Sequence, residues 1–297
     1  MTAELEKYRL FLDLVDAGIA GRPAQVPGGM SPSEWEFLYD TSSRQAVQGL
    51  VYDALEQAPE SNIPEDLAAR WLMEIGEIEK NYARIEETVE MQAAAFRKHG
   101  IHFSLLKGLE SAKYYPRPEH RIMGDIDWWM HSGDDWDAAL ELAKANGASP
   151  EYDSDGDVHY TVNGIVVEHH RKGLRTAGPC GELLLLNEHA LHHALVTGVG
   201  MRQIADYKAA LRYFDGKYDR EEYEGLVEEE GLKPWTEVLE TLPDRFLELV
   251  MEDGNFGLDK KNRFSGFFKR ASFFARIAPG EFVKRWWGLV VGRIKRK

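Results

Sequence analysis

The feature that most constrains the fold is a helical pattern of apolar residues that continues for about thirty residues, from Glu65 to Lys98. Its apolar side chains recur at the spacing that places them on one face of a helix: Leu67, Trp71, Ile75, Ile78, Tyr82, Ile85, Val89 and Phe96. The pattern therefore predicts one long helix.

Two further helical segments are expected before it, so residues 1–99 form a helical region. Residues Glu4–Ala20 carry apolar side chains at helical spacing, and a Gly-Arg-Pro sequence ends the pattern. A Ser-Pro-Ser-Glu sequence that begins at Ser31 is typical of a capped helix start. The segment after it runs through Trp35 and extends toward Leu55.

At residue 100 the pattern changes to short strands and turns. The predicted strands are Ile101–Leu106, Asp125–Met130, Asp157–Val162 and Ile165–His170, and the predicted helices are Leu109–Tyr115 and Asp135–Asn146. The last two strands are separated by Asn163-Gly164, a strong signal for a two-residue hairpin turn. This part of the chain therefore forms an α/β core with one small mixed sheet.

Helical patterns return after the core, which places the chain in the α+β class. The segments predicted to be helical are Glu182–Val196, Gln203–Phe214, Arg220–Glu230, Pro234–Thr241 and Asp244–Glu252. We expect four regions: an N-terminal helical region (1–99), the α/β core (100–180), a C-terminal helical region (181–258) and a basic, aromatic-rich tail (259–297).

Charge is distributed unevenly along the chain. The 297 residues carry a formal charge of −14, yet residues 260–297 hold twelve Lys or Arg and one acid, which leaves −25 on the rest. An acidic body disfavours nucleic acid as a partner. The single cysteine, Cys180, cannot form an internal disulfide, and no stretch of about 18 apolar residues is present. We therefore expect a cytoplasmic protein.

The end of the tail, residues 281–297, has basic ends around an apolar centre that bears Trp286 and Trp287. This composition suits an anionic membrane surface, so peripheral membrane contact is one interpretation. Docking of the tryptophan face on the acidic body is another. Binding of nucleic acid by the tail is a third, with no motif behind it.

Candidate metal ligands lie in two of the predicted strands. Because side chains alternate along a strand, Asp125 and Asp127 point to one face, and a divalent cation between them would relieve their repulsion. Glu168 lies in an apolar strand, where an ionised carboxylate needs a partner. If the two strands are neighbours, Glu168 becomes a third ligand. A solvated acidic strand end is the alternative.

A second candidate site lies upstream. Lys107-Gly108 occupies the turn between a predicted strand and a predicted helix. Such a turn offers an ammonium, backbone N–H groups and a helix N-terminus to a polyphosphate.

The histidines of a later helix have a different interpretation. His189 and His193 are four residues apart and share a helix face, but Glu188 precedes the first histidine instead of following it. The metalloprotease motif is therefore absent. We interpret them as helix histidines that bond to neighbours or line a cleft, with a zinc site as the alternative.

Together these residues resemble a known family. The sequences that carry the resemblance are Leu-Leu-Lys-Gly at 105–108, Tyr-Tyr-Pro at 114–116, Arg121, Gly-Asp-Ile-Asp at 124–127, a later Val-Glu-His strand, the histidines at 189, 192 and 193, and residues 200–206. Over residues 30–215 the chain is similar to the uncharacterised nucleotidyltransferase-like family of bacteria, a branch of the polymerase β-type nucleotidyltransferase superfamily.

The resemblance implies a nucleotidyltransferase fold and transfer of a nucleoside monophosphate from a nucleoside triphosphate to an unknown acceptor hydroxyl. It implies two divalent cations, Mg²⁺ or Mn²⁺, held by the catalytic residues Asp125, Asp127 and Glu168. Residues expected at the nucleotide are Lys107, Gly108, Ser111, Arg121, Gly124 and Arg202. The expected acceptor is a small molecule or a protein.

One departure from the family pattern leaves an alternative open. The superfamily turn usually carries Gly-Ser or Gly-Gly, whereas Leu109 follows Gly108 here. A catalytically degenerate protein of the same fold that binds a nucleotide or a partner is the alternative function, and a scaffold docked through the basic tail is a third.

Overall fold

The computed structural model describes residues 3–58, 61–153, 156–196 and 199–240. They form two compact units. The sheet unit comprises residues 17–39 and 47–174, and the helical unit comprises residues 1–16, 40–46 and 175 onward. The four regions expected from the sequence stay a prediction, and the tail of residues 259–297 lies outside the described residues.

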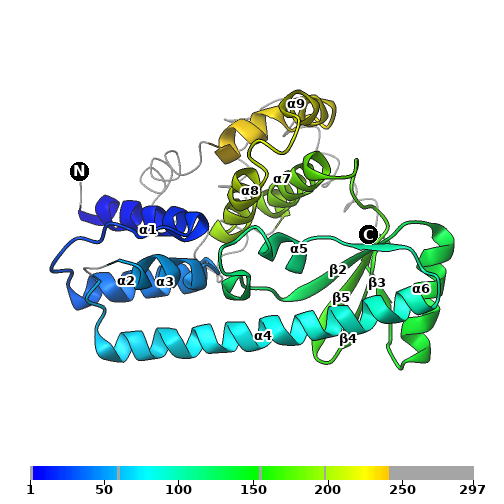
Figure 1. The fold of residues 1–297 in the computed structure, drawn as a ribbon, viewed down its shortest axis with the longest axis horizontal. Coiled ribbons are helices and arrows are strands. Elements are labelled where there is room, and N and C mark those ends of the chain that lie inside the picture. The colour runs from blue at the N-terminus through cyan, green and yellow to red at the C-terminus, as the bar shows by residue number, and fades with distance from the viewer. Residues whose placement is uncertain (1–2, 59–60, 154–155, 197–198, 241–297) are drawn as a thin grey trace, which may run out of the picture. The chain divides into compact units, whose positions relative to one another are not determined.

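The sheet unit contains a five-stranded mixed sheet. Its strands, in spatial order, are β1 (Phe103–Leu105), β2 (Asp125–Met130), β5 (Ile165–His170), β4 (Val158–Val162) and β3 (Glu151–Tyr152), and strands β2 to β5 are labelled at the right of Figure 1. Strands β2 and β5 run parallel, and all other neighbours are antiparallel. The predicted mixed sheet and the α+β class are therefore confirmed.

Strands β4 and β5 form the predicted hairpin. Val162 pairs with Ile165 across Asn163 and Gly164, whose φ angles are 52° and 76°. A type I′ turn requires positive φ at both central residues, and asparagine and glycine tolerate it best. The turn fixes the register of the hairpin, and the register decides which face of the sheet each side chain occupies.

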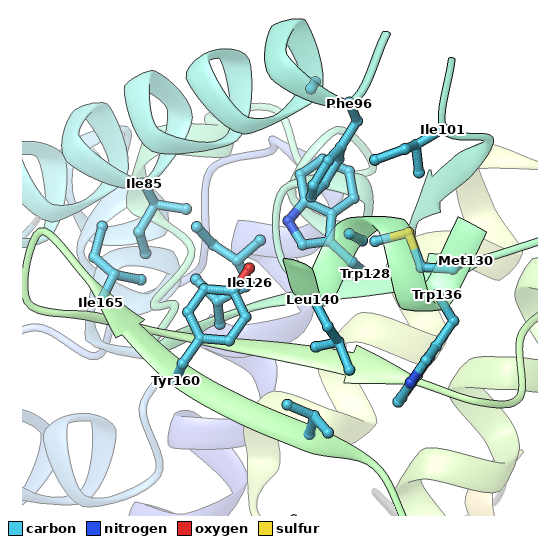
Figure 2. Packing of buried hydrophobic residues seen from close by; sticks show 14 of the residues in the cluster. Ile85, Phe96, Ile101, Ile126, Trp128, Met130, Trp136, Leu140, Tyr160 and Ile165 are labelled. Carbon is cyan, nitrogen blue, oxygen red and sulfur yellow. The ribbon is translucent and has the colours of Figure 1, made fainter. Parts of the chain in front are cut away.

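Two helices cover one face of the sheet. Helix α4 (Glu65–Lys98) has the predicted bounds, and α6 (Gly133–Ala145) begins after Ser132, whose side chain accepts a hydrogen bond from the Asp135 N–H. Figure 2 shows side chains of both helices packed against the sheet. The labelled members of this cluster are Ile85, Phe96, Ile101, Ile126, Trp128, Met130, Trp136, Leu140, Tyr160 and Ile165. Their burial is the main stabilising contribution to the unit.

A chain of hydrogen-bonded polar groups runs through this apolar layer. Trp128 Nε1 donates to Gln92 Oε1 at 2.8 Å, and Gln92 Nε2 donates to the Tyr160 hydroxyl at 3.3 Å. That hydroxyl lies 2.9 Å from Nε2 of His169, a fully buried side chain. Burial lowers the pKa of His169 to about 4, so its imidazole is neutral at physiological pH. His169 is thus part of the core.

The first predicted helix is present, and the second is interrupted. Helix α1 spans Ala3–Ala20, and α2 (Pro32–Arg44) is followed by a separate helix, α3 (Gln48–Glu56). The expected continuous segment toward Leu55 is wrong because the backbone turns at Ala46, whose φ is 55°. A single residue in the left-handed region interrupts the helical hydrogen bonding.

The start of α2 carries the predicted cap. The Ser31 N–H donates to Glu34 Oε2 at 2.8 Å, and the Glu34 N–H lies 3.4 Å from Ser31 Oγ. This reciprocal pair is the arrangement of a capping box, and the Glu34 N–H also donates to the Ser31 carbonyl at 3.0 Å.

Two predicted elements of the core are shorter than expected. Strand β1 retains three residues of the segment 101–106, because only Phe103–Leu105 pair with β2. Helix α5 (Leu109–Ala112) is one turn long, and the expected continuation to Tyr115 is wrong. A short 3-10 helix, η1 (Pro118–His120), follows it.

Among the described residues from 175 onward, the helical unit has the helices α7 (Pro179–Val196), α8 (Met201–Tyr213) and α9 (Arg220–Glu229) and a further helical segment at residues 233–240. Most of α1 also belongs to this unit. Asn187 of α7 connects the elements, because its Nδ2 donates to the Tyr223 hydroxyl at 3.0 Å and to Thr236 Oγ1 at 2.7 Å. The helix predicted at Asp244–Glu252 lies outside the described residues.

No helix among the residues that the structure describes has both the length and the apolar character needed to cross a lipid bilayer. The proposed membrane contact of residues 281–297 concerns a segment outside that part of the chain.

Candidate metal centre

Parallel pairing of β2 and β5 brings the predicted carboxylates to one face of the sheet. Asp127 lies directly opposite Glu168, and Asp125 lies opposite Val166. Side chains that face each other across neighbouring strands point to the same side, so all three carboxylates lie on the face opposite the apolar core. The neighbouring strands that the sequence interpretation required are therefore present.

Asp127, Glu168 and His170 offer three possible ligand atoms within 4.8 Å of one another. His170 Nε2 lies 2.7 Å from Asp127 Oδ1 and 3.5 Å from Glu168 Oε2. Within the described ranges, no other cluster brings three potential metal-binding side chains so close together. Asp125 lies two positions before Asp127 on the same face but outside this trio, so its role as a ligand stays a prediction.

Lys107 brings a positive charge to the same site. The Leu106 N–H donates to the Asp127 carbonyl at 2.9 Å, which continues the pairing of β1 with β2 and positions the next residue. Lys107 Nζ lies 2.9 Å from Asp127 Oδ1. The ammonium and the His170 imidazole therefore contact the same carboxylate oxygen.

The turn after Lys107 differs from the expected phosphate site in one respect. Gly108 has a φ of 62°, a conformation that side chains with a Cβ rarely adopt, and it precedes α5. Because α5 has only four residues, the predicted helix N-terminus contributes little dipole for a phosphate. Charge at this end of the site comes from the lysine instead.

The charged groups of the site stabilise one another. Burial alone would raise the pKa of Asp127, but Lys107 and His170 outweigh it and hold the pKa well below its usual range. Burial opposes a charge on His170, yet the hydrogen bond to Asp127 raises the pKa of the imidazole. Burial, followed by the nearby charge of Asp127, raises the pKa of Glu168. Asp127 is therefore the ionised centre of the cluster.

The other residues predicted at the nucleotide lie in different places. Ser111 is buried on α5, and Arg121 is buried with Nη1 3.5 Å from the Ile122 carbonyl. Gly124 directly precedes β2. Arg202 lies on α8, which belongs to the helical unit. Contact between these residues and a nucleotide stays a prediction.

The histidines of α7 do not form a comparable group. The ring centroids of His189 and His193 lie 4.5 Å apart. In the part of the chain that the structure describes, no third donor joins them to make a metal-binding trio. The geometry therefore gives the zinc alternative no support.

The sequence interpretation missed two members of the site. Strand alternation places His170 on the same face as Glu168, but its contact with Asp127 depends on the pairing of β5 with β2. Asp157 lies just before β4, and its Oδ2 is 2.9 Å from His170 Nδ1. The hairpin signal could have found Asp157, because extending that register by one residue sets it opposite His170.

The donor set fits a divalent cation. Carboxylate oxygens are preferred ligands of Mg²⁺ and Mn²⁺, and an imidazole nitrogen suits first-row transition ions. Asp127 and Glu168 are the carboxylates that would hold such an ion, and a ring nitrogen of His170 lies within 4.8 Å of a carboxylate oxygen of each.

Comparison with known proteins gives one finding. A family described as uncharacterised nucleotidyltransferase matches residues 31–180, about half of the chain. No curated protein and no solved structure gives a significant match. The matched span begins next to the start of α2, ends within the first turn of α7, and includes the whole Asp127, Glu168 and His170 cluster.

Proposed function

Because this chain belongs to the uncharacterised nucleotidyltransferase family, we propose that it transfers a nucleoside monophosphate from a nucleoside triphosphate to an acceptor hydroxyl. The hydroxyl oxygen attacks the α-phosphorus, and the bond from that phosphorus to the β-bridging oxygen breaks. Pyrophosphate leaves with the electron pair of that bond. The hydroxyl proton passes to a carboxylate of the site.

The observation that carries this proposal is the register that sets Asp127 opposite Glu168 on the polar face of the sheet. In the proposal, these two residues and Asp125 hold two ions, Mg²⁺ or Mn²⁺. The ions would lower the pKa of the acceptor hydroxyl and neutralise charge on the phosphate oxygens. The remaining contribution of the protein is to orient donor and acceptor.

Individual residues have separate roles in this proposal. The Glu168 side chain is 38% exposed, against 2% for Asp127, so Glu168 is the carboxylate that an acceptor can approach. We assign it the role of general base or acceptor-side ligand. Lys107 and Arg121 hold phosphate charge, and Arg202 is the weaker candidate for that role.

A second candidate function rests on the contact between Lys107 and Asp127. A lysine ammonium bound to the central carboxylate can neutralise it without a metal ion. A protein that keeps the fold but only binds a nucleotide or a partner would be stable in this arrangement. Leu109, which stands where the superfamily usually has a second small residue, favours the same alternative.

Thermal unfolding with each of the four nucleoside triphosphates, with and without Mg²⁺ or Mn²⁺, tests whether the site binds a nucleotide through a metal ion, which the second candidate function does not require. We expect one nucleotide to raise the melting temperature in a metal-dependent way, and the Asp125→Asn/Asp127→Asn double variant to lose this shift. Each protein is compared with its own nucleotide-free sample. No shift with any nucleotide would contradict the transferase.

We propose a small molecule or a protein as the acceptor, and the cytoplasm as the location. The charge of −25 on residues 1–259 disfavours a nucleic acid acceptor. Peripheral membrane contact through residues 281–297 is tested by vesicle flotation of the whole chain and of a chain that ends near Pro279. Equal flotation of the two would remove this contact from the proposal.

A further inference from the structure

The His170 imidazole is held between carboxylates at both of its nitrogens. Nδ1 lies 2.9 Å from Asp157 Oδ2, and Nε2 lies 2.7 Å from Asp127 Oδ1. Only 17% of the side chain is exposed. The ring therefore has a fixed orientation, with Nε2 directed into the carboxylate cluster and Nδ1 directed away from it.

Asp157 is itself held in place. Its Oδ1 accepts the Arg171 N–H at 2.8 Å, and its own N–H donates to Asp153 Oδ1 at 3.0 Å. Both carboxylate oxygens are thus occupied, one by the backbone that follows β5 and the other by His170. The residue is positioned by main-chain contacts, so its orientation does not depend on a flexible partner.

This arrangement has the chemistry of a metal-bound histidine. In protein metal sites, the imidazole usually donates its second ring N–H to a carboxylate, which fixes the tautomer and makes the ligating nitrogen more basic. Asp157 can accept that N–H from Nδ1. Nε2 donates its proton to the ionised Asp127 at 2.7 Å, and a cation that replaced this proton would meet the Nε2 lone pair on the side of Asp127 and Glu168. Nothing else in the nucleotidyl transfer proposed above requires a histidine here.

We propose that His170 Nε2 is a nitrogen ligand of the cation held by Asp127 and Glu168, with Asp157 as the residue that positions it. The inference rests on the proposed function for the presence of the cation. One consequence concerns metal preference. Mg²⁺ favours oxygen ligands, whereas first-row transition ions accept imidazole readily, so the site favours Mn²⁺ over Mg²⁺.

The test uses the full chain with Mn²⁺ alone and reads coordination instead of activity. Electron paramagnetic resonance of unbound Mn²⁺ gives the affinity, and electron spin echo modulation detects a directly bound ¹⁴N nucleus. We expect ¹⁴N modulation in the wild type and its loss in His170→Ala. Mn²⁺ affinity should fall by about tenfold or more, and the preference over Mg²⁺ should shrink.

Two further variants make the result specific. His159 lies on the same face, opposite Glu168, with Nε2 3.6 Å from Glu151 Oε2, so His159→Ala should keep both the ¹⁴N signal and the affinity. Asp157→Asn should keep the ¹⁴N signal but weaken Mn²⁺ binding by about tenfold, as expected of a positioning residue. Thermal unfolding of each variant confirms that it is folded.

The outcomes separate this inference from the function on which it rests. Mn²⁺ binding without ¹⁴N modulation in the wild type would overturn the histidine ligand and leave the metal-dependent transferase standing. A ¹⁴N signal that survives His170→Ala and disappears in His159→Ala would overturn it in the same way. If Mn²⁺ does not bind, or if Asp127→Asn does not weaken its binding, both the histidine ligand and the metal-dependent transferase would be overturned.

Discussion

Lys107 Nζ and His170 Nε2 approach the same oxygen of Asp127, at 2.9 and 2.7 Å. The carboxylate is thus neutralised by two side chains, one of which is the residue expected at the nucleotide phosphates. A cation that binds Asp127 must compete with the ammonium for this oxygen. The lysine displaced in this way is then available to an anion.

We predict that Lys107→Met raises the affinity for Mn²⁺ in the absence of nucleotide, by about tenfold, because the competing ammonium is removed. The same change should weaken triphosphate binding measured at saturating Mn²⁺. Isothermal titration of metal and then nucleotide checks both effects. Unchanged or weaker Mn²⁺ binding in the variant would show that the ammonium does not compete.

We predict that neutralising Asp127 and neutralising Glu168 affect the free energy of unfolding differently. Asp127→Asn removes the partner of buried cationic groups and should lower the free energy of unfolding at pH 7 by about 3 kcal/mol. Glu168→Gln should leave it unchanged or raise it, because burial and Asp127 raise the pKa of Glu168 and so disfavour its ionised form. Urea unfolding of both variants checks the contrast, and equal losses would contradict it.

The contribution of Asp127 to stability should also depend on pH. The pKa of Asp127 is lowered in the folded chain, so its contribution to stability is complete above its unfolded pKa of about 3.9 and is lost as the pH falls further. The wild type should therefore lose stability faster than Asp127→Asn below about pH 4. Parallel pH profiles of the two proteins would contradict this expectation.

We predict that stability also depends on the buried histidine of η1. His120 Nδ1 lies 2.7 Å from Asp53 of α3, and Nε2 lies 3.0 Å from Glu79 of α4, while Arg117 also contacts Asp53. Burial and Arg117 oppose a charge on the imidazole, but the bonds to Asp53 and Glu79 raise its pKa. The stabilisation is complete below the unfolded pKa of about 6.5 and is lost as the pH rises through the folded value.

His120→Gln tests this dependence because glutamine keeps hydrogen-bonding capacity and does not titrate. The variant should be less stable than the wild type by roughly 2 kcal/mol at pH 6, and the difference should shrink at higher pH. Chemical unfolding between pH 6 and 9 measures it. A difference that stays constant over this range would show that the protonated form of His120 does not contribute.

We predict that Gly173→Ala perturbs the polar face of the sheet. A Cβ at this position would lie 1.8 Å from Cδ2 of Trp129, on the strand that carries Asp127. We expect a loss of about 1–3 kcal/mol, as for other overpacked sites. Gly133→Ala is the control, because its Cβ would meet nothing within 4 Å. Equal unfolding midpoints for the two variants would contradict the close contact.

Elements with a strong local signal were predictable from the sequence. The bounds of α4 follow from apolar periodicity between Pro64 and His99, and the hairpin follows from Asn163-Gly164. Strand β3 has two exposed residues and no apolar pattern, and it exists only because Tyr152 and its neighbour pair with β4. Such pairing depends on distant residues, so short strands cannot be found from local sequence.

In the candidate site, too, some features were predictable from local sequence and others depended on the pairing of distant strands. Strand alternation puts Asp127 and Asp125 on one face, but only the parallel register shows that Asp127 is the one opposite Glu168. His169 and His170 are adjacent and equally ambiguous in the sequence. In the structure, one is a neutral core residue and the other lies among carboxylates, because neighbours in a strand point to opposite faces.

The length of α4 has a consequence for where this chain can be shortened. At 34 residues it extends well beyond the sheet, packing against α3 as well as β2. The family match likewise begins at residue 31, far ahead of the first strand. A fragment that began at the first strand would lack Ile85 and Phe96 and would leave the core open on that side. A fragment that keeps this core closed therefore has to include α4 together with the sheet.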